Sequence, residues 1–182
     1  MARFGKLPVN IPKEVKIEVT GGVMKIEGPK GALERKLPDR VSVKQEGTVL
    51  FVLSRGRDKQ SLANQGTTRS HIMNMITGVT QGWKKTLELV GSGYRAEVQG
   101  KDLILTVGYS HPVKVSAPGT VSFSVEKNVI NVEGIDLEVV CQLAANVRRV
   151  REPEPYKGKG IKYIDEIVRR KAGKAAAKAV VA

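Results

Sequence analysis

The sequence predicts an α+β fold in two tandem, duplicated domains, each an antiparallel β-sheet unit packed against one α-helix, with a basic N-terminal arm and C-terminal tail. Short runs of alternating apolar and polar residues indicate half-buried antiparallel strands. One helical stretch follows each group of strands, an order typical of α+β rather than parallel α/β proteins. The whole pattern occurs twice along the 182-residue chain, which indicates a duplication.

The two copies align at an offset of about 79 residues. Glu18-Val19 in the first copy corresponds to Glu97-Val98 in the second, and Asp58 corresponds to Asp136. We therefore expect three parts: an N-terminal α+β repeat with its arm over residues 1–82, a C-terminal α+β repeat over residues 83–168, and a basic tail, expected to be flexible, over residues 169–182.

The sequence of each copy predicts a similar series of strands and one helix. Helices are expected after Asp58 and Asp136, because aspartate is a good N-cap residue. The second helix has a clear apolar stripe, whereas Gly66 interrupts a weaker stripe in the first. Residues 78–83 are predicted to form the hinge between the copies. Strands are expected at 15–19, 23–27, 41–43 and 49–53 in the first copy, and at 96–98, 103–107, 113–115, 121–125 and 129–132 in the second.

The charge balance predicts a polyanionic partner. The chain has 31 Lys and Arg against 18 Asp and Glu, a net charge of +13. Such an excess indicates nucleic acid, or less often an anionic membrane surface. From Arg148 to Ala182 there are 11 basic and 4 acidic residues, so more than half of the excess lies in the last fifth of the chain.

Other functional classes receive little support from the sequence. No apolar run is long enough for a membrane span, and none follows the N-terminal charges as in a signal peptide, so we expect a cytoplasmic protein without membrane contact. Cys141 is the single cysteine and is expected to be a buried, reduced structural thiol. The two histidines, His71 and His111, lie in different copies. We expect no enzymatic activity, cofactor, metal or small-molecule substrate.

One motif keeps an enzymatic alternative open. The sequence GSGYRA, from Gly91 to Ala96, matches the G-x-G-x-x-A dinucleotide fingerprint, which requires a helix immediately after it. The residues that follow, EVQGKDLIL, are typical of a strand, a turn and a second strand. Whether a helix or a strand follows Ala96 therefore distinguishes a nucleotide-binding enzyme from a protein that binds nucleic acid without catalysis.

Three clusters in the second half are candidates for binding RNA, because they combine cations with groups that stack or donate hydrogen bonds. The first, GYSHPVK, is also compatible with an ordinary hairpin tip, and the second, VRRVR, ends a helix where cations favour the helix dipole. The third, PEPYKGKGIKY, contains prolines and glycines that disfavour helix and strand, so we expect RNA to order it. The clusters start at Gly108, Val147 and Pro153.

The residues of these clusters resemble the large-subunit ribosomal protein L-six family, of bacterial type. The resemblance rests on PEPYKGKGI and the preceding AANVRRVREPEP, together with RFGKLPVNIP, GPKGALER, GYRAEV and GYSHPV, and runs from Arg3 to about Lys174. Two residues depart from the family pattern: Ser92, where an apolar residue is usual, and Cys141, where glycine is usual. A general nucleic-acid-binding protein with a basic tail remains an alternative.

The resemblance implies a structural constituent of the large ribosomal subunit with two duplicated α+β domains. It implies binding to 23S-type rRNA near the sarcin–ricin loop, at the base of the factor-binding stalk, with neighbouring ribosomal proteins as partners and translation factors nearby. The second domain would be the main rRNA-binding domain. The expected rRNA-binding residues are Arg3, Lys6, Tyr94, Arg95, Tyr109, Ser110, His111, Pro112, Lys114, Arg148, Arg149, Arg151, Tyr156, Lys157, Gly158, Lys159, Gly160 and Lys162.

Overall fold

The computed structural model describes residues 5, 7–56 and 58–171, and it divides into two compact units. One unit runs to Trp83 and includes Ile135–Leu137, and the other comprises Lys84–Gly134 and the chain from Glu138 onward. Each unit contains antiparallel sheets and one helix, which confirms the predicted α+β class. None of the helices in the described ranges is long and apolar enough to cross a membrane.

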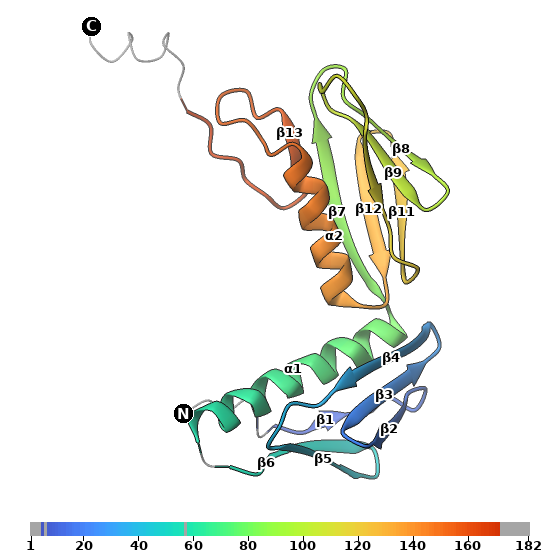
Figure 1. Ribbon diagram of the computed structural model, residues 1–182, viewed down its shortest axis with the longest axis vertical. Helices are drawn as coiled ribbons and strands as arrows, with labels where there is room; N and C mark the ends of the chain where they lie inside the picture. The colour runs from blue at the N-terminus through green and yellow to red at the C-terminus, as the bar shows by residue number, and fades with distance from the viewer. Residues whose placement is uncertain (1–4, 6, 57, 172–182) are drawn as a thin grey trace, which may run out of the picture. The chain divides into compact units, whose positions relative to one another are not determined.

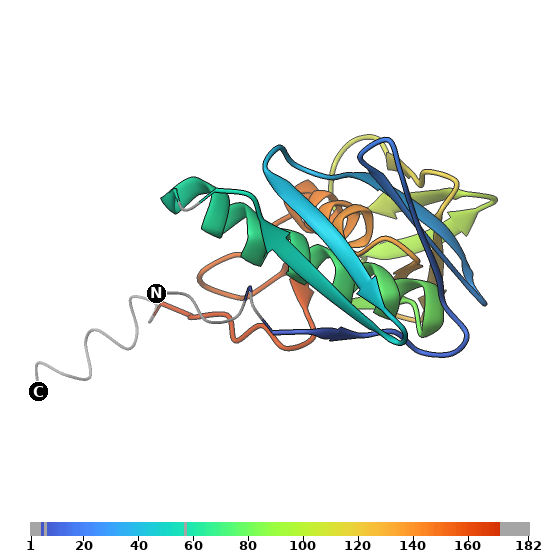
Figure 2. The same cartoon turned by 90° about the horizontal axis from the view of Figure 1, so that it is seen from below.

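The first unit contains two three-stranded sheets and one long helix (Figure 1). The strand orders are β1-β6-β5 and β2-β3-β4, and all pairs are antiparallel. In Figure 2, strands β5 and β6 cross in front of the helix, as expected for a sheet that packs on it. The elements are β1 (Val9–Asn10), β2 (Lys16–Thr20), β3 (Val23–Gly28), β4 (Gly31–Lys36), β5 (Val41–Glu46), β6 (Val49–Ser54) and α1 (Lys59–Thr80).

The core of the first unit lies between α1 and these sheets. Met24 and Ile26 of β3 are fully buried, as are Ile72 and Val79 of α1. A Cβ atom built on Gly28 would lie only 2.6 Å from Cγ2 of Val79. A glycine is therefore required for this close approach of strand and helix.

Helix α1 has a weak apolar stripe because part of its buried face is polar. Gln65 is buried, and its side-chain amide donates a hydrogen bond of 2.7 Å to the carbonyl oxygen of Val52. The helix begins after Asp58 as predicted, but the Asp58 side chain makes no capping hydrogen bond. Its carboxylate instead pairs with Arg40 at 2.8 Å.

The second unit repeats the topology of the first and adds one strand. Its sheets have the orders β10-β9-β8 and β11-β12-β7-β13. In these orders β7, β12 and β11 correspond to β1, β6 and β5, and β13 is the addition. The elements are β7 (Trp83–Val90), β8 (Arg95–Gln99), β9 (Asp102–Thr106), β10 (Val113–Ser116), β11 (Val121–Glu126), β12 (Val129–Gly134), α2 (Leu137–Val150) and β13 (Gly160–Tyr163).

The predicted apolar stripe of the second helix is confirmed. Val140, Leu143, Ala144 and Val147 are the buried residues of α2. Cys141 lies beside this stripe and is half-buried, so the prediction of a buried thiol is wrong. A residue next to the stripe points partly toward solvent because of the helical period.

The half-buried position of Cys141 leads to a prediction for its removal. Cys141→Ala should leave the affinity for an rRNA fragment within about threefold of the wild type, since substitutions away from special features change free energies by only about 0.5 kcal/mol. Filter binding measures this affinity, with thermal unfolding as the control for stability. A larger loss of affinity at unchanged melting temperature would show that the thiol has a role in binding.

Several elements were not predicted. Strands β1, β4, β7 and β13 form where the sequence showed no strand, and the expected hinge at 78–83 is largely helix and strand. Only Gln81 and Gly82 separate α1 from β7. The expectation that the PEPYKGKGIKY segment forms no regular structure by itself is wrong for its last four residues, which pair with Leu87–Val90 of β7.

Candidate nucleic-acid interface

The GSGYRA sequence forms a corner between two strands. Strand β8 begins at Arg95 and includes Ala96, so a strand and not a helix follows the motif. The dinucleotide fingerprint needs helix amides at this place, so the motif does not form a dinucleotide site. A Cβ atom on Gly91 would lie 2.8 Å from the ring of Tyr94, which shows that the glycine makes room for that ring. Ser92 is exposed and does not pack in the core.

The GYSHPV loop is joined to the end of α2 through Tyr109. The Tyr109 hydroxyl donates a hydrogen bond of 2.8 Å to the carbonyl oxygen of Val150. The guanidinium of Arg151 lies 5.3 Å from the centre of the Tyr109 ring, within the range of a cation–π interaction. Hydrogen bonding with the side chain of Tyr109, and to a smaller extent with that of Tyr94, raises the pKa of Arg151. Two of the predicted clusters are thus brought together in space.

Most of the remaining residues of this loop face solvent. Ser110, His111 and Pro112 are exposed, and Tyr109 itself keeps 43% of its surface accessible. An exposed hydroxyl, imidazole and ring beside a fixed cation are suited to contact sugars, bases and phosphates.

The PEPYKGKG segment is shaped by its own chain. The Glu154 amide donates to the Lys159 carbonyl oxygen at 2.9 Å, and the Gly158 amide donates to the Glu154 carbonyl oxygen at 2.9 Å. Gly158 has a φ of +71°, a left-handed conformation that favours glycine. The chain's own backbone hydrogen bonds thus define the shape of the loop.

Gly160 closes the loop where the backbone passes close to an earlier part of the chain. A Cβ atom on Gly160 would lie 2.6 Å from the carbonyl oxygen of Glu152 and 2.7 Å from Cα of Pro153. Both Gly158 and Gly160 are buried, so packing alone accounts for them. Contact of either glycine with RNA stays a prediction.

The loop presents cations and a ring to solvent. Lys157 is exposed, and Tyr156 keeps 56% of its surface accessible. The Lys159 ammonium donates a hydrogen bond of 3.3 Å to the hydroxyl of Ser92. The departure from the family pattern at position 92 therefore adds a polar contact between the GSGYRA corner and the loop.

Three of the expected RNA-binding cations are engaged in ion pairs. Their partners are Glu166 for Arg148 at 2.7 Å, Asp102 for Lys114 at 2.8 Å and Glu88 for Lys162 at 2.9 Å. The hydrogen bond from Lys114 is the main cause of a lowered pKa at Asp102, and a hydrogen bond from Ser116 lowers it further. Sequence reasoning could not assign these pairs, because each joins residues that are far apart in the sequence or on separate strands.

Other expected cations are more accessible. Arg149 and Lys157 are exposed and form no ion pair with any residue that the structure describes, and Arg95 is exposed at the start of β8. Arg3 and Lys6 lie outside the described residues. Arg170 was missed: a Cβ atom on Gly158 would lie 3.0 Å from its Nε, so its guanidinium lies beside the loop. In the sequence, Arg170 lies in the basic run VRRK, most of which belongs to the predicted tail at residues 169–182.

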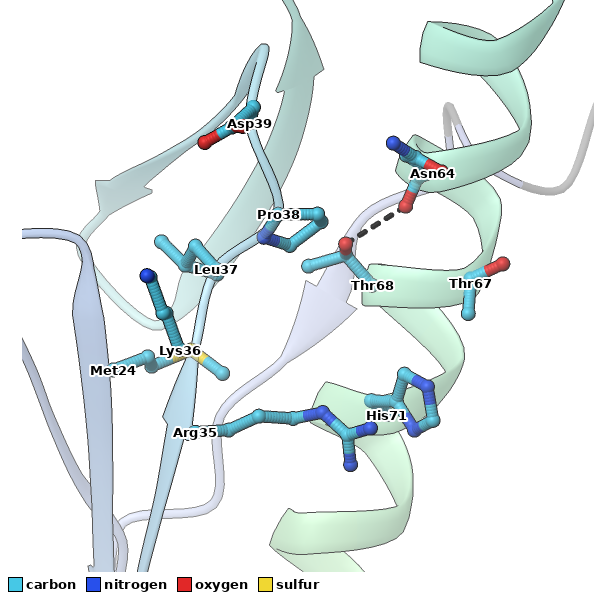
Figure 3. Close-up of a pocket in the computed structure, with 10 residues that line it drawn as sticks. All are labelled: Met24, Arg35, Lys36, Leu37, Pro38, Asp39, Asn64, Thr67, Thr68 and His71. Carbon is cyan, nitrogen blue, oxygen red and sulfur yellow. Dashed lines mark hydrogen bonds between the residues drawn. The ribbon is translucent and has the colours of Figure 1, made fainter.

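The first unit contains a separate hollow of about 550 Å³ between β4, the turn after it and α1 (Figure 3). Figure 3 shows the Arg35 guanidinium directed toward the imidazole of His71. Lys36 and Asp39 also line this hollow, so its charges are mixed. Sequence analysis did not point to it.

Fold and surface together define a class: a duplicated α+β protein with a lysine-bearing loop and an exposed tyrosine on its second unit. No group of three or more His, Cys, Asp or Glu in the described ranges could hold a metal ion. Comparison with known proteins agrees with this class. The family model for "Ribosomal protein L6" matches residues 11–82 and 90–164, one match for each repeat.

Individual relatives extend the similarity over nearly the whole chain. The chain is 53% identical over 175 residues to "Large ribosomal subunit protein uL6" of Staphylococcus aureus strain JH9, covering 96% of this chain and 98% of the relative. The protein of the same description from Staphylococcus aureus strain USA300 has the same identity and coverage. The chain belongs to the ribosomal protein L6 family.

Proposed function

We propose that this protein is a structural constituent of the large ribosomal subunit in the cytoplasm and binds 23S-type rRNA through its second unit. Its site is near the sarcin–ricin loop, at the base of the factor-binding stalk. Family membership supports the ribosomal role, and the names of the S. aureus relatives support the large subunit. The role is that of a scaffold and not of a catalyst.

The observation that carries the RNA-binding part is the hydrogen-bonded loop at residues 153–160. Its hydrogen bonds and its two buried glycines fix the backbone, while Lys157 and Tyr156 remain exposed. A rigid loop loses little conformational entropy on binding, so phosphate contacts contribute more of their free energy to affinity.

The neighbouring surface extends this loop toward Tyr94 and Tyr109. The Lys159–Ser92 hydrogen bond links the loop to the GSGYRA corner, and Arg151 lies over the Tyr109 ring. Cations beside exposed rings suit folded RNA with splayed bases better than a regular duplex. Neighbouring ribosomal proteins would be further partners, with translation factors nearby.

Sedimentation of cell extract on a sucrose gradient tests the proposal. We expect the full-length protein to travel with the large subunit, and to stay there after nuclease digestion of free DNA and messenger RNA. A general nucleic-acid-binding protein would instead spread over both subunits and the nucleic acid at the top of the gradient. That distribution would contradict the proposal.

A further inference from the structure

The chain after β13 returns to the PEPYKGKG loop. We call residues 164–171 the strap. The Lys171 amide donates a hydrogen bond of 2.8 Å to the carbonyl oxygen of Pro155, near the tip of the loop. One residue earlier, the Arg170 guanidinium lies against Gly158, with Nε and Nη2 3.0 Å and 3.1 Å from the position of a Cβ on that glycine. The strap therefore brings a further cation to the loop.

A bidentate ion pair anchors the strap to helix α2. Nε and Nη2 of Arg148 donate hydrogen bonds of 2.9 Å and 2.7 Å to the two carboxylate oxygens of Glu166. Both side chains are about three-quarters buried, at 27% and 24% exposure. The Tyr163 amide also donates to the same carboxylate at 3.2 Å, so Glu166 is held from two directions.

The chemistry of this pair favours a fixed geometry. A planar guanidinium that binds both oxygens of a carboxylate sets the orientation as well as the distance. The hydrogen bond from Arg148 holds the pKa of the Glu166 carboxyl below its usual range, so the pair is fully charged near neutral pH. Arg148 also lies 3.5 Å from Glu152, at the start of the loop.

We propose that the Arg148–Glu166 pair positions the strap, and that the strap places Arg170 beside Lys157 and Lys159 as a third cation for RNA phosphates. Arg148 and Glu166 act as positioning residues, and neither contacts RNA. The proposal rests on the proposed function, in which this loop binds rRNA. It assigns Arg148 a different role from the one that its position in the VRRVR cluster predicts.

Whether one substitution strengthens or weakens RNA binding tests the positioning role. Glu166→Gln removes a negative charge, so electrostatics alone predicts tighter binding to a polyanion. Positioning predicts the opposite, because a freed strap must be ordered again on binding; we expect roughly a three- to tenfold loss of affinity. The matched control is Asp165→Asn in the exposed neighbouring residue, which changes the charge equally and should bind at least as well as the wild type.

The probe is a 23S-type rRNA fragment that contains the sarcin–ricin loop, titrated with full-length protein at several salt concentrations. Arg170→Gln should flatten the slope of log K against log salt by roughly 0.7 to 0.9, the value for one phosphate contact. An unchanged slope for Arg170→Gln, or equal or tighter binding by Glu166→Gln, would overturn the proposal.

Hydrogen exchange in the free protein provides a readout that does not depend on RNA. Glu166→Gln should speed exchange at the amides of Gly158 and Lys171, while those of Val140 and Val147 in α2 stay protected. Unchanged exchange at the loop would overturn the positioning role. If the wild type fails to bind the fragment, the proposed function fails instead, and exchange alone decides whether the strap is anchored as described.

Discussion

The Lys157→Ala/Lys159→Ala double variant should lose on the order of tenfold in affinity for the rRNA fragment at physiological salt, because two phosphate contacts are removed. The slope of log K against log salt should flatten by roughly 1.4 to 1.8, or 0.7 to 0.9 for each contact. The melting temperature should not change, since Lys157 is exposed and Lys159 donates only one 3.3 Å hydrogen bond to an exposed serine. Titrations over a range of salt concentrations measure both quantities.

The matched control removes the same charge from the first unit. Lys13 and Lys16 are exposed and lie in the first repeat, so Lys13→Ala/Lys16→Ala should change the slope by much less. Equal losses for the two double variants would show that general charge, and not this loop, drives binding. Wild-type affinity and slope for Lys157→Ala/Lys159→Ala would show that the segment is an ordinary solvated loop.

Gly160→Ala should destabilise the protein and weaken RNA binding at nearly unchanged salt slope. The new methyl group would lie 2.6 Å from the carbonyl oxygen of Glu152. Because that oxygen is a backbone atom, a change of side-chain rotamer cannot relieve the clash. We expect a loss of about 1–3 kcal/mol in the free energy of unfolding, which lowers the melting temperature by roughly 3–10 °C. Thermal unfolding and RNA titration measure the two effects.

Gly119→Ala is the control for Gly160→Ala. Gly119 lies in a turn of the same unit, and a Cβ atom there has no neighbour within 4 Å. This change should leave the melting temperature within about 2 °C of the wild type, since surface substitutions cost at most about 0.5 kcal/mol. If Gly160→Ala behaves like Gly119→Ala, the close approach to Glu152 does not limit the loop.

The sequence predicts strands β8 to β12 of the second unit, because apolar residues recur at every second position in most of them. Leu103 and Leu105 of β9 are fully buried, and Val121 of β11 is buried, as this spacing predicts. Strand β7 was missed because its first half, WKKT, has no alternation, and its pairing with β12 and β13 decides its structure. Strand β13 was missed because local glycine and proline preferences were outweighed by pairing with β7.

The candidate site shows the same limit. Residue types placed Tyr109 and Arg151 in separate clusters, and only the folded chain shows that they stack. Likewise, Arg148 and Glu166 are 18 positions apart, so a sequence motif gives no sign of their ion pair. Composition indicates which side chains suit RNA, whereas the neutralisation of particular cations depends on tertiary contacts.

The added strand β13 has a second consequence, which concerns aggregation. In the first unit the edge strand β1 has two residues, too few to recruit another chain, whereas its counterpart β7 has eight. Long open edges expose unpaired amides and carbonyls and promote association between molecules. By pairing with Leu87–Val90, β13 covers half of this edge with the protein's own chain. The segment that carries the lysine loop thus also shortens the open edge of β7 at which another chain could pair.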